Sequence, residues 1–149
     1  MSTQNVTVPQ GVPKSVIVAA GVIIEHGKVL VSRRKAGTHL EGVWEFPGGK
    51  VEPGEDPRDT VRRELHEELG VTCVAGEILD VTFHHYPEAH KSVLLLFFAC
   101  TRAPQSAAPQ ALDVAEVAWF GPGDLTDSAF PPADLAVLRK VRTLLDAAS

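Results

Sequence analysis

GGKVEPGEDPRDTVRRELHEELGV, residues 48–71, is the stretch that decides how this chain folds and where its chemistry lies. Asp56 is a typical N-cap residue, Pro57 suits the first helical position, and Gly70 supplies a C-terminal stop. The intervening apolar residues are spaced four apart and form one stripe, which must face a core: Val61, Leu65 and Leu69. The stretch therefore predicts a loop followed by a helix over about residues 57–69.

Three glutamates lie on this predicted helix, beside the apolar stripe. At ~100° per residue, Glu64 and Glu68 lie about 40° apart around the helix axis, and Glu67 lies roughly 60° to the other side of Glu64. Like charges four residues apart destabilise an isolated helix by ~0.2–0.5 kcal/mol per pair unless a cation neutralises them. Carboxylate oxygens without sulfur or nitrogen ligands favour Mg²⁺ or Mn²⁺ over zinc.

The remaining patterns predict a mixed α/β domain with a helix on each face of the sheet. Residues 15–25 and 28–32 read as a hairpin of two strands, residues 72–83 as one or two strands broken near Gly76, and residues 84–90 as a polar turn. Residues 92–101 and 116–120 read as further strands, and residues 133–147 as an amphipathic helix.

Length and composition indicate one domain with a sizeable core, because the chain has 149 residues of which 44% are hydrophobic. We expect residues 1–14 to be a flexible leader and residues 15–149 to form the domain. The net charge of −5 argues against binding polymeric nucleic acid. We see no signal peptide or membrane span and expect a cytoplasmic protein, with Cys73 and Cys100 as buried structural thiols.

Two further polar groups have open interpretations. Arg33, Arg34 and Lys35 follow the second strand and form either a solvated loop or a site for an anion or a base. A zinc site at His84, His85 and His90 is disfavoured, because adjacent strand residues point to opposite faces and no cysteine accompanies them. We expect these histidines to line a pocket or to lie on the surface.

Residues 49–71 resemble the Nudix box at every specified position, including Gly49, Glu55, Arg63-Glu64 and Glu67-Glu68. The preceding WEFPGG, residues 44–49, is similar to the MutT-type subgroup of nucleoside triphosphate pyrophosphohydrolases. The resemblance implies an α/β/α sandwich, with a mixed β-sheet between the Nudix helix and a C-terminal helix.

The resemblance also implies roles for individual residues. Glu64, Glu67 and Glu68 match metal ligands for Mg²⁺, which Mn²⁺ can replace, and the carbonyl of Gly49 is a further ligand. Arg63 matches the residue that orients these glutamates. The remaining matched positions are Glu55, which supports the joint between loop and helix, and Lys50, which meets phosphate oxygens or is simply solvated.

Residues outside the box provide candidates for the general base and for recognition of the nucleobase. Asp113 or Glu116 can supply the base, and we favour Asp113. Arg34 matches a base-contacting arginine, and Trp44 or Phe46 can supply a stacking wall. Asp134 occupies the position of a base-reading Asn, although it also suits a cap for the last helix.

The predicted activity is Mg²⁺-dependent hydrolysis of a nucleoside triphosphate to a monophosphate and pyrophosphate. The substrate is expected to be a modified nucleotide such as 8-oxo-dGTP, whose removal would cleanse the nucleotide pool. Alternatives are CTP or dCTP, a nucleoside diphosphate-sugar or ADP-ribose, and a Nudix-fold regulator that binds a nucleotide without catalysis. The expected partner is a small-molecule nucleotide, without nucleic acid or membrane, and the protein is expected to be a monomer or homodimer.

Overall fold

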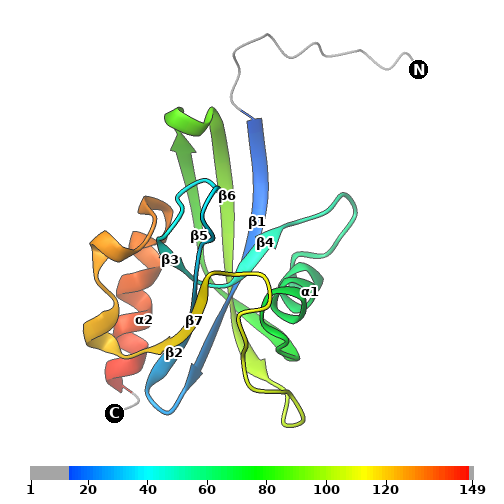
Figure 1. Cartoon of the computed structure of the whole chain (residues 1–149), viewed down its shortest axis with the longest axis vertical. Coiled ribbons are helices and arrows are strands. Elements are labelled where there is room, and N and C mark those ends of the chain that lie inside the picture. The colour runs from blue at the N-terminus through cyan, green and yellow to red at the C-terminus, as the bar shows by residue number, and fades with distance from the viewer. Residues whose placement is uncertain (1–13, 148–149) are drawn as a thin grey trace.

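The computed structural model describes residues 14–147, which form one mixed sheet and two α-helices (Figure 1). The strands are β1 (Lys14–Glu25), β2 (Lys28–Arg33), β3 (Trp44–Glu45), β4 (Gly48–Lys50), β5 (Cys73–Tyr86), β6 (Lys91–Arg102) and β7 (Glu116–Phe120). The helices are α1 (Pro57–Leu69) and α2 (Leu135–Ala147). Short 3₁₀ turns are η1 (Pro87–Ala89), η2 (Pro122–Asp124), η3 (Asp127–Ala129) and η4 (Pro132–Asp134).

The sheet is built around β1, which lies at the middle of the strand order and pairs with β2, β4 and β6. The strand order is β3-β2-β1-β6-β5, with β4 paired to β1 and β7 paired to β2. β1 runs parallel to β6 and antiparallel to β2 and β4. Because β4 begins the loop that leads into α1, its pairing with β1 attaches the Gly48-Gly49 segment to the centre of the sheet.

The core has two layers, one under each helix. Successive side chains of a strand point to opposite faces. Accordingly, Ala19 and Ile23 of β1 pack in the cluster beneath α1, whereas Ala20 and Val22 pack in the cluster beneath α2. Figure 1 shows α1 and α2 on opposite sides of the sheet. The predicted α/β/α sandwich is confirmed.

Helix α1 has the predicted bounds and the predicted caps. The Asp56 carboxylate accepts a hydrogen bond of 2.9 Å from the backbone N–H of Arg58, and Gly70 ends the helix in the left-handed conformation with φ +70°. The stripe of Val61, Leu65 and Leu69 is fully buried. Local capping and periodicity therefore fixed this element, and they fixed which side of it faces the core.

The hairpin of β5 and β6 differs from its prediction. The polar turn expected at residues 84–90 is wrong in its first half, because β5 continues through Tyr86 and only η1 and His90 make the turn. His84 packs on Tyr86 with ring centroids 4.5 Å apart, and His85 Nδ1 lies 3.0 Å from Ser92 Oγ on β6. The expected break near Gly76 is confirmed as shifts of register between Ala75 and Asp80.

The C-terminal helix begins two residues later than predicted, at Leu135, because η4 occupies residues 132–134. The leader predicted for residues 1–14 lies outside the described residues except for Lys14, which belongs to β1. Cys73 and Cys100 are buried free thiols, as predicted. Among the helices within residues 14–147, none is long and apolar enough to span a membrane.

Candidate active site

Two of the three glutamates of α1 point toward the sheet. The side chain of Glu64 is only 16% exposed, and Glu64 and Glu68 both line the same cavity. Burial, and after it the adjacent carboxylate of Glu64, raise the pKa of Glu68 to about 9. Without a cation, these two carboxyl groups are therefore held together with one of them protonated.

The loop in front of α1 requires glycine at both positions of the Gly48-Gly49 pair. A Cβ atom on Gly49 would lie 2.3 Å from Cδ of Glu64, and one on Gly48 would lie 2.1 Å from the carbonyl oxygen of Ala19. The pairing of β4 with β1 sets this close approach, since Gly49 is opposite Ala19. The backbone of Gly49 is thus brought against the Glu64 carboxylate.

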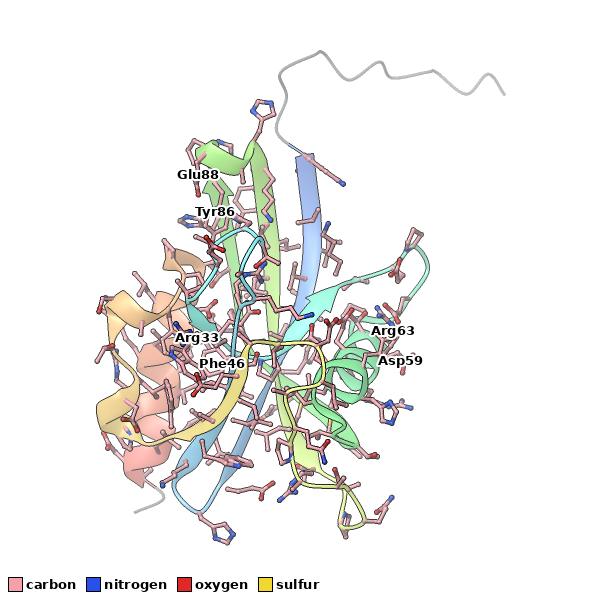
Figure 2. All side chains as sticks on the ribbon, in the orientation of Figure 1. Arg33, Phe46, Asp59, Arg63, Tyr86 and Glu88 are labelled. Carbon is pink, nitrogen blue, oxygen red and sulfur yellow. The ribbon has the colours of Figure 1, made fainter. Side chains whose placement is uncertain are left out.

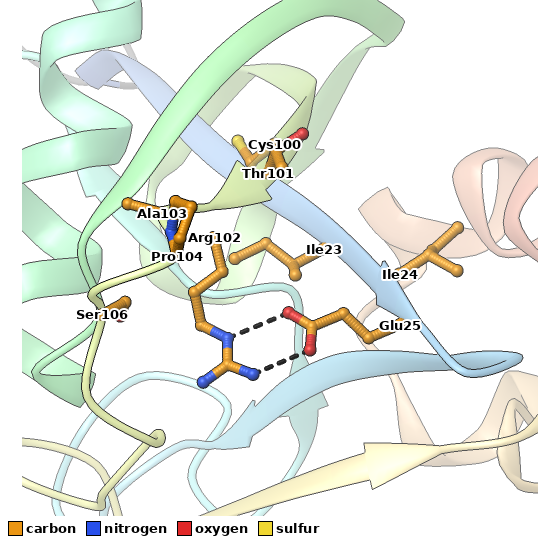
Figure 3. Close-up of a pocket in the computed structure, with 9 residues that line it drawn as sticks. All are labelled: Ile23, Ile24, Glu25, Cys100, Thr101, Arg102, Ala103, Pro104 and Ser106. Carbon is orange, nitrogen blue, oxygen red and sulfur yellow. Dashed lines mark hydrogen bonds and ion pairs between the residues drawn. The ribbon is translucent and has the colours of Figure 1, made fainter.

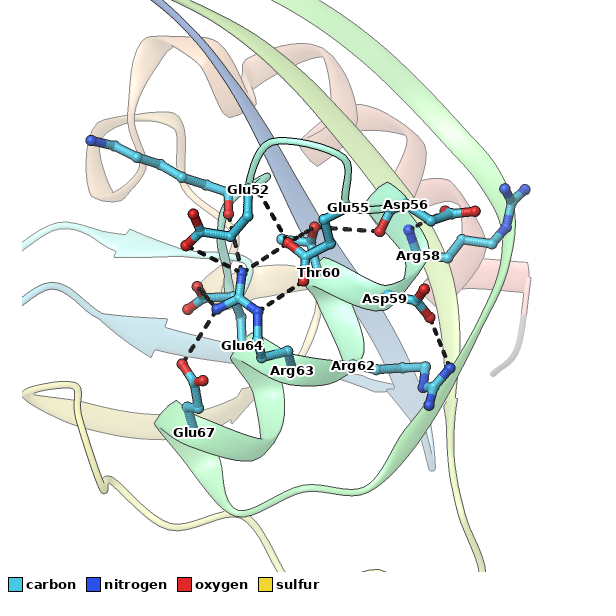
Figure 4. A network of polar contacts seen from close by, with 11 residues as sticks. Glu52, Glu55, Asp56, Arg58, Asp59, Thr60, Arg62, Arg63, Glu64 and Glu67 are labelled. Atoms are coloured by element: carbon cyan, nitrogen blue, oxygen red, sulfur yellow. Dashed lines mark hydrogen bonds and ion pairs between the residues drawn. The ribbon is translucent and has the colours of Figure 1, made fainter.

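Arg63 holds the loop and the helix together (Figure 4). Its Nε and Nη2 donate to the two carboxylate oxygens of Glu55 at 2.9 and 3.0 Å, and its Nη1 donates to Glu64 Oε1 at 2.9 Å. Hydrogen bonds from Arg63 and then from Thr60 lower the pKa of Glu55 to about 2. Glu55 therefore stays ionised and keeps the guanidinium beside Glu64, as the resemblance implied.

Glu67 takes a different direction from its two neighbours. Its side chain is 56% exposed, lies 3.5 Å from Arg63 Nη1, and lines a separate surface hollow beside His66 and Thr72. Among the described residues, no three acidic, His or Cys side chains are grouped to hold an ion. Glu64, Glu68 and the nearby carbonyl of Gly49 fit a hard divalent cation chemically. Glu67 would join them only after its side chain turns.

The carboxylates open into a cavity of about 450 Å³, which lies within the usual range for small-molecule sites. Its floor is apolar and comes from alternate residues of β1 and β6, namely Val16, Val18, Ala20, Val93, Leu95 and Phe97. The loop between β2 and β3, the end of β5 and η4 form the walls. Of the predicted residues, Arg34, Phe46, Lys50 and Asp134 all line it.

Asp134 is the most buried ionisable group in the cavity, with 3% of its surface exposed. Burial raises its pKa well above the ordinary value, and Glu45 raises it further, while Arg34 opposes the shift. Asp134 lies in η4, and no described hydrogen bond joins its carboxyl group to the amides of α2. The alternative that Asp134 caps the last helix is therefore wrong. Its carboxyl group is buried beside the cavity, and this burial favours the protonated form.

Arg34 forms the opposite wall together with Glu45. Arg34 Nη1 donates to both carboxylate oxygens of Glu45 at 3.2 and 3.1 Å, and Arg34 Nε donates to the carbonyl of His39 at 2.6 Å. Burial raises the pKa of Glu45, and the guanidinium partly offsets that rise. Sequence reasoning identified Arg34 but missed Glu45, although it is the residue between the two aromatic positions.

The two candidate stacking aromatics lie in different places. Phe46 is buried, lines the cavity and packs on Phe97 and Phe130 at centroid distances of 5.9 and 5.7 Å. Trp44 is not among the residues that line the cavity, and its ring packs 4.8 Å from Phe120 instead. Of the two alternatives for a stacking wall, Trp44 or Phe46, only Phe46 therefore lines the cavity.

Besides Glu45, the cavity residues missed in the sequence include His39, Tyr86 and Lys91. Burial lowers the pKa of Lys91, and the nearby cations Arg34 and Lys50 lower it further. Within residues 14–147, no ion pair or hydrogen bond holds its ammonium group. Figure 2 shows Tyr86 near the tip of the β5–β6 hairpin, and Lys91 begins β6 on the other side of the turn. The pairing of Tyr86 with Lys91 across β5 and β6 brings these two residues to the cavity together.

Asp113 and Glu116 lie outside the cavity lining. The backbone N–H of Asp113 donates to the carbonyl of Glu68 at 3.1 Å, and the Asp113 carboxylate contributes to the raised pKa of Glu68 while pairing with Lys35. Glu116 instead pairs with Arg33 at 3.4 Å. Asp113 is therefore the nearer of the two candidates to the acidic end.

A second cavity of about 350 Å³ lies at the other end of β1 and β6 (Figure 3). Its two charged residues neutralise each other, since Arg102 donates to both carboxylate oxygens of Glu25 at 2.9 and 2.7 Å. This pair lowers the pKa of Glu25. The hollow therefore offers no free charge, and the ion pair ties β1 to β6.

Clustered glutamates at the mouth of a nucleotide-sized cavity, in an α/β/α sandwich, define a hydrolase that acts on phosphoanhydrides. The family model of the NUDIX domain matches residues 15–141. The chain therefore belongs to the NUDIX family and to its MutT-type pyrophosphohydrolases.

Relatives with different substrates are about equally similar to the chain. The 8-oxo-dGTP diphosphatase of Escherichia coli K12 is 32% identical over 132 residues, covering 88% of this chain and 99% of the relative. The CTP pyrophosphohydrolase of the same organism is 30% identical over 143 residues, covering 88% and 94%.

Solved structures agree on the fold. The solution structure of the E. coli ORF135 protein has a TM-score of 0.72 and 32% identity, covering 95% of this chain and 97% of that one. The crystal structure of the MutT protein from Methanosarcina mazei Go1 has a TM-score of 0.70 and 26% identity, covering 91% and 96%.

Proposed function

We propose that this protein uses Mg²⁺ to hydrolyse a nucleoside triphosphate to a nucleoside monophosphate and pyrophosphate, with 8-oxo-dGTP as the first candidate substrate. The observation that carries the proposal is one cavity that joins the Glu64–Glu68 pair to the buried carboxyl group of Asp134. Its physiological result would be removal of oxidised nucleotides from the pool.

Glu64, Glu68 and the carbonyl of Gly49 would hold the ion, with Glu67 added after rotation of its side chain. The ion, Mg²⁺ or in its place Mn²⁺, would neutralise charge on the phosphates and lower the pKa of a bound water. Lys50 lines the cavity beside these residues and is proposed to contact phosphate oxygens. Arg63 keeps Glu64 oriented through the hydrogen bond of 2.9 Å.

Asp113 is the proposed general base. Its carboxylate is exposed and paired with Lys35, and it belongs to a loop that is bound to the end of α1 through Glu68. A small movement of this loop would carry the carboxylate along the acidic end of the cavity, where it can accept a proton from the attacking water.

The buried Asp134 supports recognition of an oxidised guanine. An ionised carboxylate only accepts hydrogen bonds, whereas a protonated carboxyl group both donates and accepts, as an amide does. Because burial keeps the pKa of Asp134 high, its carboxyl group can present both functions to the edge of a purine. Phe46 and the apolar floor would contact the flat faces of the base.

A pyrimidine triphosphate is the second candidate, since one relative of nearly full coverage is named a CTP pyrophosphohydrolase. Cytosine has an exocyclic amine, which can donate a hydrogen bond to a carboxylate. Besides Asp134, the cavity contains Glu45, which could accept that hydrogen bond. The nucleoside diphosphate-sugar, ADP-ribose and non-catalytic alternatives have no comparable feature in the cavity, and all three glutamates of the box are present.

An assay panel tests the proposal. Canonical nucleoside triphosphates, 8-oxo-dGTP, ADP-ribose and UDP-glucose are each incubated with Mg²⁺, and release of pyrophosphate is scored against release of phosphate. We expect pyrophosphate from a triphosphate, with 8-oxo-dGTP giving the highest kcat/KM. A higher value for CTP would select the second candidate, and no pyrophosphate from any triphosphate would overturn the proposal.

Glu67→Gln tests the third ligand separately. We expect loss of metal-dependent turnover with an unchanged circular dichroism spectrum, because the side chain is exposed and packs on nothing that the fold needs. Glu77→Gln, an exposed glutamate on β5, is the matched control. Near-normal rates for Glu67→Gln would show that Glu67 does not enter the metal site.

A further inference from the structure

Side chains cover one part of the outer edge of β5 and leave the other part uncovered. Within residues 14–147, β5 is the last strand of the sheet order and pairs only with β6 (Figure 1). Side chains already cover part of this edge, because Arg58 Nε donates to the carbonyl of Gly76 and Lys140 Nζ to that of Leu79, both at 3.0 Å. The backbone N–H of Val81 is bonded to Asp80 Oδ1 at 2.9 Å. Beyond Val81, no such side chain covers the edge.

An apolar surface lies beside the open part of this edge. Phe83 is 66% exposed, Val81 50% and Ile17 46%. The register places Ile17, Leu94 and Phe83 in one row across β1, β6 and β5, on the face that α1 covers further along. Exposed apolar groups next to an unpaired strand edge are the usual features of a surface that another strand covers.

The sequence of this segment is complementary to itself when it is paired antiparallel. Residues 80–84 read Asp-Val-Thr-Phe-His. A twofold axis at Thr82 places each Val opposite a Phe, and Thr opposite Thr, while Asp80 keeps its ion pair with Lys140 Nζ at 3.3 Å. Pairs of an aromatic with a β-branched residue are favourable across antiparallel strands. A twofold interface must be self-complementary in this way.

The hydrogen-bond pattern supports the same register. The N–H of Val81 and the carbonyl of Leu79 bond to side chains and not to β6, so the backbone groups of the odd-numbered residues point outward. With the axis at Thr82, the outward groups of Val81 would meet those of Phe83 in the second copy as a hydrogen-bonded pair, and the N–H of Val81 would exchange its local bond to Asp80 Oδ1 for one to the carbonyl of Phe83.

We propose that a second copy of this chain covers the edge, by antiparallel pairing of the two β5 strands about Thr82. The two sheets then continue into one another, and the exposed rings of Phe83 are covered. Tyr86, which ends β5 beyond the paired segment and lines the cavity, stays on the wall of its own cavity.

Sedimentation velocity of the full chain over a wide concentration range tests the proposal. We expect a dimer of two 16.0 kDa chains that dissociates on dilution. Phe83→Asp places a carboxylate opposite Val81 of the second copy, and we expect dimer affinity to fall by about tenfold or more. Val74→Asp, on the same strand and 63% exposed but outside the paired segment, should leave it unchanged. A wild-type chain that stays monomeric, or a Phe83→Asp dimer of full affinity, would overturn the proposal.

A crosslink tests the register. Two residues in a non-hydrogen-bonded pair have Cα atoms ~4.5 Å apart, which is within the range of a disulfide. Thr82→Cys should therefore form a covalent dimer under mild oxidation with diamide, seen on a non-reducing gel. Val74→Cys is the control and should stay monomeric on the same gel, because the native thiols are buried. Equal crosslinking of the two variants, or none in Thr82→Cys, would exclude pairing about Thr82.

Discussion

The two ends of the cavity are built in opposite ways. The acidic end comes from one continuous stretch, in which Gly49, Arg63, Glu64 and Glu68 lie within 24 residues of one another along the loop and α1. The base end comes from β2, β3, the β5–β6 hairpin and η4, so that Arg34 and Asp134 meet across 100 residues of sequence.

This difference explains why one end is recognisable and the other is not. Local geometry sets the acidic end, since caps, helical periodicity and two glycines place its carboxylates wherever the stretch folds. Packing sets the base end, where protonation depends on burial and on neighbours from distant strands. The following variants test whether the two ends are separable.

Glu68→Gln should have the largest effect. Removing a charge from the acidic end forfeits several kcal/mol of transition-state stabilisation, so we expect kcat to fall by ~10²–10⁴-fold. The midpoint temperature of thermal unfolding should not fall, because the variant also removes the like-charge contact with Glu64. Steady-state kinetics with each nucleotide measures this. We expect kcat to fall by the same factor for every nucleotide. A fall confined to one nucleotide would show that the two ends of the cavity do not act separately.

Gly49→Ala should come next. The added Cβ would lie 2.3 Å from Glu64 Cδ and must displace that carboxylate. A displacement of ~1 Å at a catalytic group can lower the rate about 10²-fold, and we expect that loss in kcat. Gly123→Ala is the control, because nothing lies within 4 Å of the Cβ that it adds. If the two variants have the same kcat, the contact between the loop and Glu64 does not matter for turnover.

Lys91→Met tests the unpaired cation at the base end. A hydrogen bond to a charged group contributes ~1.5–3 kcal/mol, so its loss should raise KM by about tenfold or more while kcat changes little. The variant keeps the aliphatic stem that lines the cavity. Lys28→Met, at an exposed strand end, is the matched control. A fall in kcat at constant KM would place Lys91 at the acidic end instead.

Asp134→Asn should have the smallest effect at neutral pH, a change of a few-fold in kcat/KM for 8-oxo-dGTP. An amide keeps both the donor and the acceptor of a protonated carboxyl group. The kcat/KM of the wild type should fall as pH rises through the raised pKa of Asp134, whereas that of the variant should show no such fall. Activity profiles over pH with both proteins measure this, and parallel profiles would show that Asp134 does not read the base as an acid.

The same substitution has a consequence for stability. The folded pKa of Asp134 is raised above its ordinary value of 3.8, so the folded state binds the proton more tightly. The contribution of protonated Asp134 to the free energy of unfolding is complete at pH values below 3.8 and is lost as pH rises through the folded pKa. Urea unfolding at several pH values should therefore show a steeper alkaline loss in the wild type than in Asp134→Asn.

The sequence predicted some elements better than others, for physical reasons. It located α1 to the residue because Asp56, Pro57 and Gly70 act locally. It misplaced the turn after β5, since His84 and His85 are polar but lie in a strand whose pairing with β6 decides their conformation. It offered Trp44 or Phe46 as a stacking wall and could not choose between them, since only the packing of Trp44 on Phe120 keeps the indole out of the cavity lining.

The sequence by itself determined the reaction class of this protein, because the glutamates, the arginine and the glycines that define it act over distances of a few residues. Tertiary structure alone decided that Asp134 is buried with a raised pKa, that Lys91 and Glu45 line the same cavity, and that Glu67 points away from it. Those properties depend on which groups from distant strands share the same small volume, and no local pattern of residues records that.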